Sequence, residues 1–217
     1  MTEDSVSAAR DIWVANQGYS VDKRKRHIID AAAELFAVRG FDRTSVADIA
    51  QACGLEKPSL YHYFPSKKSI LLGVLALGID DLIHEANEVL KQDIDDPLER
   101  LHQLLLCHSR NFDKKISHVK TFLLESNGLD AAERERYLAR RREYEQIILD
   151  VVIEGQAAHR VRDGDPVILA YGVLGMFNWM VQWYKTGGSV SAEAIGNILA
   201  SVAVQGLAPA PAERAPT

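Results

Sequence analysis

The chain has 217 residues, of which 47% are hydrophobic and 25% are charged, and its formal net charge is −5. This length suits a small domain joined to one larger domain, and the apolar content suits a globular protein with a core. The acidic balance excludes a protein that coats nucleic acid through its overall charge. The charge is uneven, however, because residues 21–68 hold nine Lys and Arg against six Asp and Glu. A basic segment on an acidic body is typical of a protein that binds DNA through one domain.

Signals for export or membrane insertion are not found in the sequence. Cys53 and Cys107 are the only cysteines and lie far apart, which favours two buried free thiols in a reducing compartment over a disulfide framework. The acidic N-terminus has no central apolar run, so no signal peptide is expected. The two most apolar stretches, residues 70–79 and 167–181, are shorter than the roughly 20 residues that a membrane span needs. We therefore expect a cytoplasmic protein with no membrane contact.

The predicted elements begin with an N-terminal arm, residues 1–21, and a helix over residues 23–38. The apolar positions of this helix recur with a helical period from Ile28 to Phe36, and Gly40 ends it. The four cations at residues 23–26 precede this helix. They are either a solvated helix start or contacts to phosphate or the minor groove, and each phosphate contact would steepen the salt dependence of binding.

Two short helices joined by a tight turn are predicted within residues 44–64. Thr44 or Ser45 can cap the first helix with its hydroxyl. Gly54 suits the left-handed residue that ends a helix. Pro58 suits the first turn of the second helix, where its missing N–H costs little.

The second of these helices is too short to form alone in water. Leu60 and Phe64 share one face and can anchor it to a core, which leaves a cluster of outward polar side chains: Ser59, Tyr61, His62 and Tyr63. A helix–turn–helix places its second helix in the DNA major groove. An ordinary helical hairpin is the alternative, but it leaves this outward cluster and the lysine pair at residues 67–68 unexplained.

The rest of the chain is predicted to be helical, with no strand pattern. The expected helices span residues 66–91, 97–113, 117–126, 131–157, 166–185 and 191–205. The first of them would be about 37 Å long and could join two domains. The predicted fold is therefore all-α with about nine helices: a three-helix helix–turn–helix domain at 22–68, an effector-binding and dimerisation domain at 69–207, and a disordered Ala/Pro-rich tail at 208–217.

The stretch from Thr44 to Lys68 resembles the DNA-reading segment of the TetR family of transcriptional regulators. The resemblance extends upstream to Ile28 and downstream to Leu72. It implies contacts to base edges or their rims by Lys57, Pro58, Ser59, His62 and Tyr63, and contacts to phosphates by Thr44, Ser45, Tyr61 and Lys67. Tyr61 could instead be a core residue with a satisfied hydroxyl, and His62 a solvated surface residue.

The segment from Phe177 to Gly188 resembles a branch of this family in which some members respond to acyl-coenzyme A thioesters. That resemblance implies a large, partly apolar effector in the body. Apolar walls and polar ends for such a ligand are offered by Asn111, Phe122, Phe177, Asn178, Trp179, Gln182 and Trp183. The aromatic residues could equally belong to the core or a dimer interface. The arginine run at 140–142 could meet coenzyme phosphates or form a solvated face with i,i+4 pairs.

A homodimer is expected, because one short reading helix supplies little specificity. Two such helices about 34–36 Å apart, or a multiple of this distance, would read a near-palindromic duplex operator. The last two helices offer the dimer face: Gly172 and Gly175 permit close approach, and an apolar stripe follows at Ile195, Ile198, Leu199 and Val202. The family pairs its two C-terminal helices in the same way.

Enzyme motifs are not found, so no catalytic residue, metal or cofactor is expected. His84, Glu85 and Glu88 form a loose group that we interpret as surface and not as a metal site. The sequence thus predicts a transcriptional repressor that a lipid-like effector, such as an acyl-coenzyme A thioester, releases from DNA. The alternatives are the same fold sensing a lipophilic drug or metabolite, and a helical carrier or enzyme with no role on DNA.

Overall fold

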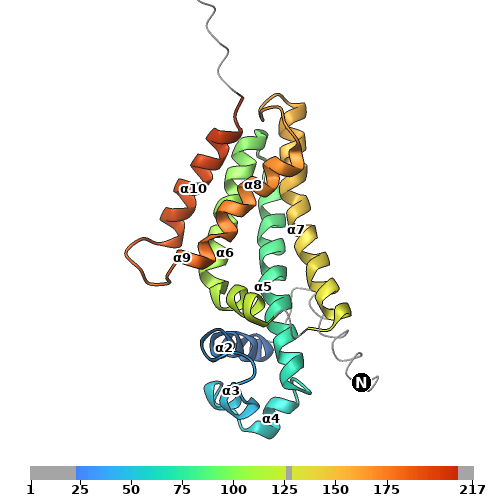
Figure 1. Cartoon of the computed structure of the whole chain (residues 1–217), viewed down its shortest axis with the longest axis vertical. Coiled ribbons are helices and arrows are strands. Elements are labelled where there is room, and N and C mark those ends of the chain that lie inside the picture. The colour runs from blue at the N-terminus through green and yellow to red at the C-terminus, as the bar shows by residue number, and fades with distance from the viewer. Residues whose placement is uncertain (1–22, 126–128, 210–217) are drawn as a thin grey trace, which may run out of the picture. The chain divides into compact units, whose positions relative to one another are not determined.

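The computed structural model describes residues 23–125 and 129–209, except for the side chains of residues 113–114 and 122–125. The predicted arm, residues 1–21, and residues 210–217 of the predicted tail lie outside this part of the chain. The described residues form nine helices and no strand, which confirms the all-α prediction (Figure 1). The helices are α2 (Lys23–Arg39), α3 (Val46–Ala52), α4 (Lys57–Tyr61), α5 (Lys67–Leu90), α6 (Pro97–Glu125), α7 (Ala131–Ala157), α8 (Pro166–Asn178), α9 (Met180–Trp183) and α10 (Ala192–Leu207).

Two helices were predicted at 97–113 and 117–126, and α6 consists of two helical segments that meet at a kink between those ranges. Lys115 has non-helical backbone angles, φ −122° and ψ 18°, and helix continues on both sides of it. The predicted interruption is therefore confirmed, with no loop between the two segments.

The single helix predicted at 166–185 is divided into α8 and α9. Asp165 caps α8 by accepting hydrogen bonds from two backbone amides, and Pro166 occupies its first turn. Trp179 lies between the two helices, as the C-cap of α8 and the N-cap of the four-residue α9. The uninterrupted apolar run concealed this boundary, because no Gly or Pro marks it in the sequence.

The chain forms two compact units. The first contains the residues up to Asp81 together with Lys115–Arg140, and the second contains Leu82–Lys114 together with the residues from Arg141 onward. This division differs from the predicted domain boundary after residue 68, because the first unit also includes the second part of α6 and the start of α7.

The first unit is built around the apolar faces of α2, α3, α4 and the first turns of α5. Figure 1 shows α2, α3 and α4 beside the start of α5. Phe36, Leu60 and Phe64 are fully buried in its core, so the anchoring roles predicted for them are confirmed.

The first unit also contains a cluster of charges from three helices. Asp81 of α5 accepts hydrogen bonds from Arg26 of α2 at 2.7 and 3.1 Å, and lies 3.4 Å from the Lys115 ammonium of α6. Lys115 also donates to Asp30 of α2 at 2.8 Å. Burial alone would raise the pKa of the Asp30 carboxyl, but its contacts with His118 and Lys115 lower that pKa to about 2.

The second unit packs α8 and α10 side by side (Figure 1). Gly196 of α10 lies directly against Ser109 of α6, and a side chain at position 196 would overlap Ser109. The Ser109 hydroxyl donates a hydrogen bond to the carbonyl of Ala192, also in α10. A close approach that only glycine permits therefore fixes α10 on α6.

A buried polar pair lies in the core of the second unit. The Nδ1 atom of His108 lies 2.9 Å from the Tyr144 hydroxyl, and the imidazole packs edge-on against the Phe177 ring at 5.6 Å. Burial, with a smaller contribution from the Arg141 charge, lowers the pKa of His108 to about 4. The imidazole is therefore neutral at neutral pH. None of the described helices is long and apolar enough to cross a membrane.

Candidate nucleic-acid interface

α4 is a five-residue helix that is held by its buried face and exposed on the other. The turn before it is a Schellman motif: the Gly54 amide donates to Gln51 and the Leu55 amide to Ala50. Gly54 has φ +63°, so the left-handed conformation predicted for it is confirmed. Pro58 lies in the first turn, as predicted. The turn at Gly54 and the proline in the first turn thus determine where α4 starts and in which direction it runs.

The outward face of α4 carries most of the predicted base-reading residues. Lys57, Pro58, Tyr61 and His62 are exposed, while Ser59 and Tyr63 are half-buried. Leu60, on the opposite face, is 0% exposed. A short helix with a buried apolar anchor and an exposed face of amine, imidazole and phenol groups has the chemistry that base edges and phosphates require.

Ser45 caps α3 at the surface. Its hydroxyl accepts a hydrogen bond from the Asp48 amide at 3.1 Å, and the Asp48 carboxylate accepts one from the Ser45 amide at 2.8 Å. This capping box confirms the capping role predicted for Ser45. The hydrogen bonds from Ser45 also lower the pKa of Asp48, so an anionic group stands beside this hydroxyl.

The side chain of Thr44 is buried, whereas its predicted phosphate contact requires an exposed hydroxyl. Its side chain is 0% exposed, and its hydroxyl donates to the Gly40 carbonyl at 2.8 Å. The hydroxyl stabilises the turn between α2 and α3 and does not face solvent. We correct the prediction for this side chain accordingly: in this structure its oxygen cannot reach a phosphate.

Lys67 and Lys68 both have partners within the first unit. The Lys67 ammonium donates to backbone carbonyls of the loop between α2 and α3. Lys68 lies 3.0 Å from Glu133 and 3.5 Å from Asp130. These anionic and dipolar partners offset the unfavourable position of two lysines in the first turn of a helix. The lysine pair is therefore explained without a phosphate.

The predicted ligand-binding residues differ in their exposure. Asn111 and Phe177 are buried in the second unit, and the Asn111 amide nitrogen has no hydrogen-bond partner among the described residues. Four others are exposed: Asn178, Trp179, Gln182 and Trp183. The side chain of Phe122 lies outside the described part, and a shared ligand site for these residues stays a prediction.

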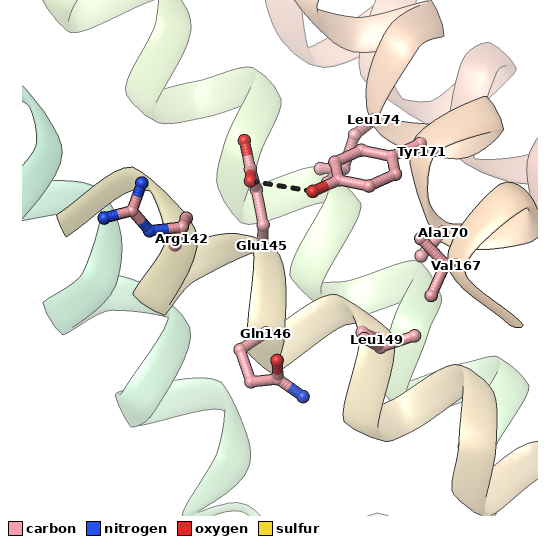
Figure 2. A pocket seen from close by; sticks show the side chains of 8 residues that line it. All are labelled: Arg142, Glu145, Gln146, Leu149, Val167, Ala170, Tyr171 and Leu174. Carbon is pink, nitrogen blue, oxygen red and sulfur yellow. Dashed lines mark hydrogen bonds between the residues drawn. The ribbon is translucent and has the colours of Figure 1, made fainter. Parts of the chain in front are cut away.

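A groove that the sequence did not predict lies between α7 and α8. It has a volume of about 140 Å³ and is lined by Arg142, Glu145, Gln146, Leu149, Val167, Ala170, Tyr171 and Leu174. Figure 2 shows the Tyr171 hydroxyl directed at the Glu145 carboxylate, to which it donates at 3.2 Å. The charge of Glu145 raises the pKa of Tyr171, so the phenol stays protonated as a donor. Only the alternation of polar and apolar residues on α7 could have indicated this groove in the sequence.

Among the described residues, no group of three or more His, Cys, Asp or Glu side chains could hold a metal ion. Cys53 and Cys107 are both buried thiols that form no disulfide, as predicted. Burial raises the pKa of the Cys53 thiol, so it stays protonated at neutral pH.

The comparisons with known proteins agree with this geometry. The family described as "Bacterial regulatory proteins, tetR family" matches residues 28–74, and "Tetracyclin repressor-like, C-terminal domain" matches residues 94–207. The HTH-type transcriptional repressor KstR2 of Rhodococcus jostii (strain RHA1) is 33% identical over 187 residues, which cover 85% of this chain and 91% of that protein.

Two solved structures extend the similarity to the whole fold. The ketosteroid transcriptional regulator KstR2 of Mycobacterium tuberculosis matches with a TM-score of 0.77 at 25% identity, over 87% of this chain and 97% of that one. AibR, solved in complex with isovaleryl coenzyme A and operator DNA, matches with a TM-score of 0.70 at 28% identity, over 85% and 98%. The exposed helix–turn–helix, the helical body and these matches along both parts of the chain show that the protein belongs to the TetR family of transcriptional regulators.

Proposed function

We propose that the protein is a homodimeric, cytoplasmic transcriptional repressor that binds a near-palindromic operator through α4 and leaves it when a lipid-like effector occupies the body. The observation that carries the proposal is the two-sided character of α4. Its apolar face is buried, and Lys57, Pro58, Tyr61 and His62 stand exposed on the other side. The similarity to KstR2 repressors supports the repressor role.

The proposed dimer face is the exposed side of α8 and α10. Ile168 of α8 and Trp179, which follows α8, are 70% and 64% exposed. Ile198 and Val202 of α10 are 63% and 54% exposed. At Gly172 and Gly175 a side chain would meet nothing within 4 Å. Large apolar side chains interleaved with glycines suit close packing of helices from a second copy. Exposure of this much apolar surface in a lone monomer would be unfavourable.

An acyl-coenzyme A thioester is the proposed class of effector. AibR, a structural neighbour, was solved with isovaleryl coenzyme A and operator DNA together, and the ketosteroid regulator KstR2 matches this chain over most of its length. In this chain, an apolar interior with a few polar groups suits a partly apolar ligand. The buried Asn111 amide, which lacks a partner in the structure, is available to one polar group of that ligand.

An effector can release DNA only if it binds one state of the protein more tightly than the other. Operator binding is tested by selecting duplexes from a random pool with the purified protein and measuring fluorescence anisotropy. We then expect isovaleryl coenzyme A and longer acyl-coenzyme A thioesters to lower the affinity for the selected duplex by about 5- to 150-fold.

Two results would contradict parts of the proposal. If no duplex is enriched, the DNA-binding part fails. If the duplex binds but no acyl-coenzyme A thioester changes its affinity, the proposed effector class fails, and a thermal-shift panel of lipophilic drugs and metabolites would then decide for the alternative effector.

A further inference from the structure

The ammonium of Lys67 lies inside the loop that leads from α2 into α3. It donates to the carbonyl oxygens of Phe41 at 2.8 Å and Thr44 at 2.9 Å, and it lies 3.4 Å from that of Asp42. We call these three carbonyls and the ammonium the Lys67 cage. A lysine ammonium has three N–H donors, so the cage accounts for all of them.

The loop itself brings these carbonyls together. Gly40 has φ +81°, which turns the chain at the end of α2. The Thr44 amide donates to Phe41 at 3.1 Å, and the Thr44 hydroxyl donates to Gly40 at 2.8 Å. Carbonyl oxygens that converge in this way carry partial negative charges of the same sign, so a cation at their centre stabilises the loop.

The cage is also joined to the core and to the start of α3. The Lys67 nitrogen lies 4.2 Å from the centroid of the Phe41 ring, a distance typical of a cation–π contact. The Phe41 ring packs edge-on against Phe36, whose side chain is fully buried, at 5.3 Å. On the other side of the cage, Thr44 is followed directly by Ser45, which caps α3.

We propose that Lys67 is a positioning residue for DNA binding: its ammonium fixes the loop between α2 and α3, and with it the start of α3, instead of neutralising a phosphate. The proposal rests on the DNA-binding function proposed above. It differs from the role that the family resemblance implies for this residue. The exposed Lys57, on the outward face of α4, keeps its predicted role as a DNA contact.

A charge-conserving substitution separates the two roles. Lys67→Arg retains the positive charge and would serve a phosphate contact as well as lysine does. The planar guanidinium cannot place three donors around the single point at which the loop carbonyls converge. We therefore expect Lys67→Arg to lower the affinity for the selected operator duplex about tenfold, and Lys67→Met to do so by at least as much.

The salt dependence and the loop itself give two further readouts. For Lys67→Arg, the slope of log affinity against log salt concentration should be unchanged. Amide hydrogen exchange in the free protein should become faster at residues 40–48, while the cores of α2 and α5 keep their protection. A general loss of stability would instead raise exchange throughout the unit.

Lys57→Met is the matched control, because the exposed Lys57 ammonium is proposed to contact DNA directly. It should weaken binding and reduce the salt slope by about 0.9 for each phosphate that the Lys57 ammonium neutralises in the wild type. It should leave exchange at residues 40–48 unchanged, because the Lys57 side chain is exposed on α4.

The proposal is overturned if Lys67→Arg binds as the wild type does, with unchanged loop exchange, while Lys67→Met shows the smaller slope of the Lys57→Met control. It is also overturned if neither Lys67 variant changes affinity or exchange. Should Lys67→Met fail to fold, Phe41→Leu supplies the test. It removes the aromatic ring that contacts the Lys67 ammonium but keeps the three carbonyls, and loop exchange should still increase. If the wild type binds no duplex, the proposed function fails, and exchange in the free protein still decides whether the cage holds the loop.

Discussion

The imidazole of His108 shows how strongly this fold controls the charge of a single residue. Its side chain is 6% exposed, and its hydrogen-bonding contact is with another neutral group, the Tyr144 phenol. Protonation in the folded state would place a cation in the core, and this is why its pKa lies at about 4. In the unfolded chain the same group titrates near pH 6.5.

This difference predicts a loss of stability in mild acid. Between pH 6.5 and pH 4 the unfolded chain binds a proton at His108 that the folded chain does not, so the free energy of unfolding decreases as the pH falls through this window. The difference between the two pKa values of His108 corresponds to about 3 kcal/mol in the free energy of unfolding. Urea unfolding of the wild type and His108→Gln from pH 7 to pH 4 would measure this pH-dependent loss of stability. A constant difference between the two proteins over that range would contradict the assignment.

Lys57, on the exposed face of α4, is predicted to contact a base of the operator. Its side chain is exposed at the start of the helix, within reach of guanine acceptors if α4 lies in the major groove. Lys57→Ala should weaken operator binding about tenfold or more and relax the preference at one base pair. Anisotropy with single-base variants of the operator would measure this. An equal loss on every duplex would indicate a phosphate contact instead.

Residue types alone predicted which side chains of the helix–turn–helix are buried, but not where two of its polar groups point. Leu60, Phe64 and Gly54 followed from helical period and from the turn chemistry of glycine. Thr44 and Lys67 were predicted to meet phosphates, yet both bind backbone carbonyls of the same loop. A sequence shows that a residue can donate a hydrogen bond, whereas its acceptor depends on how the loop folds.

Among the helices, α6 has its kink at a charged residue that pairs with two other helices. Its kink at Lys115 is accompanied by ion pairs from that residue to Asp30 of α2 and Asp81 of α5. The Lys115 side chain is only 10% exposed. Removing its charge would leave the Asp81 carboxylate, whose side chain is 15% exposed, without one of its cationic partners, which is costly.

Lys115→Met should therefore lower the free energy of unfolding by about 2–3 kcal/mol, as measured by urea denaturation. Lys91→Met is the matched control, since Lys91 pairs with Glu88 on the surface of α5 and its loss should leave the midpoint unchanged. In the Asp30→Asn variant, Lys115→Met should lower the free energy of unfolding by less than it does in the wild type, because the two residues interact directly. An equal decrease in both proteins would show that the ion pair between Lys115 and Asp30 contributes nothing to stability.

The ends of most helices could be predicted because capping residues mark them. The observed limits of α2, α5, α7 and α10 lie within two residues of the predicted ones. The kink in α6 lies between the two helices predicted at 97–113 and 117–126. The break between α8 and α9 could not be predicted, because neither a proline nor a glycine marks it in the sequence.

For the whole molecule, the exposed apolar side of α8 and α10 is the feature that a second copy would cover. Ile198→Glu would place a charge at the centre of that face, and burying an unpaired charge is strongly unfavourable. We expect a dimeric wild type and a monomeric variant by light scattering, with operator affinity lost in the variant.

Val38→Glu is the control for this prediction. Val38 is a large apolar residue that is 81% exposed on α2, away from α8 and α10 in the sequence, so its replacement should leave the dimer intact. A monomeric wild type, or an Ile198→Glu variant that stays dimeric, would exclude this face as the interface.

In the proposed dimer, the contact between Gly196 and Ser109 would influence how related regulators avoid mixing their subunits. Because a glycine and a serine lock α10 at one rotation about its own axis, the side chains on its outer surface always emerge in the same directions. A duplicated copy could therefore become selective for itself by exchanging bulky and small residues at positions such as 198 and 202, with no change in its interior. Substituting Gly196 would instead turn or displace the helix, and so change every one of those directions at once.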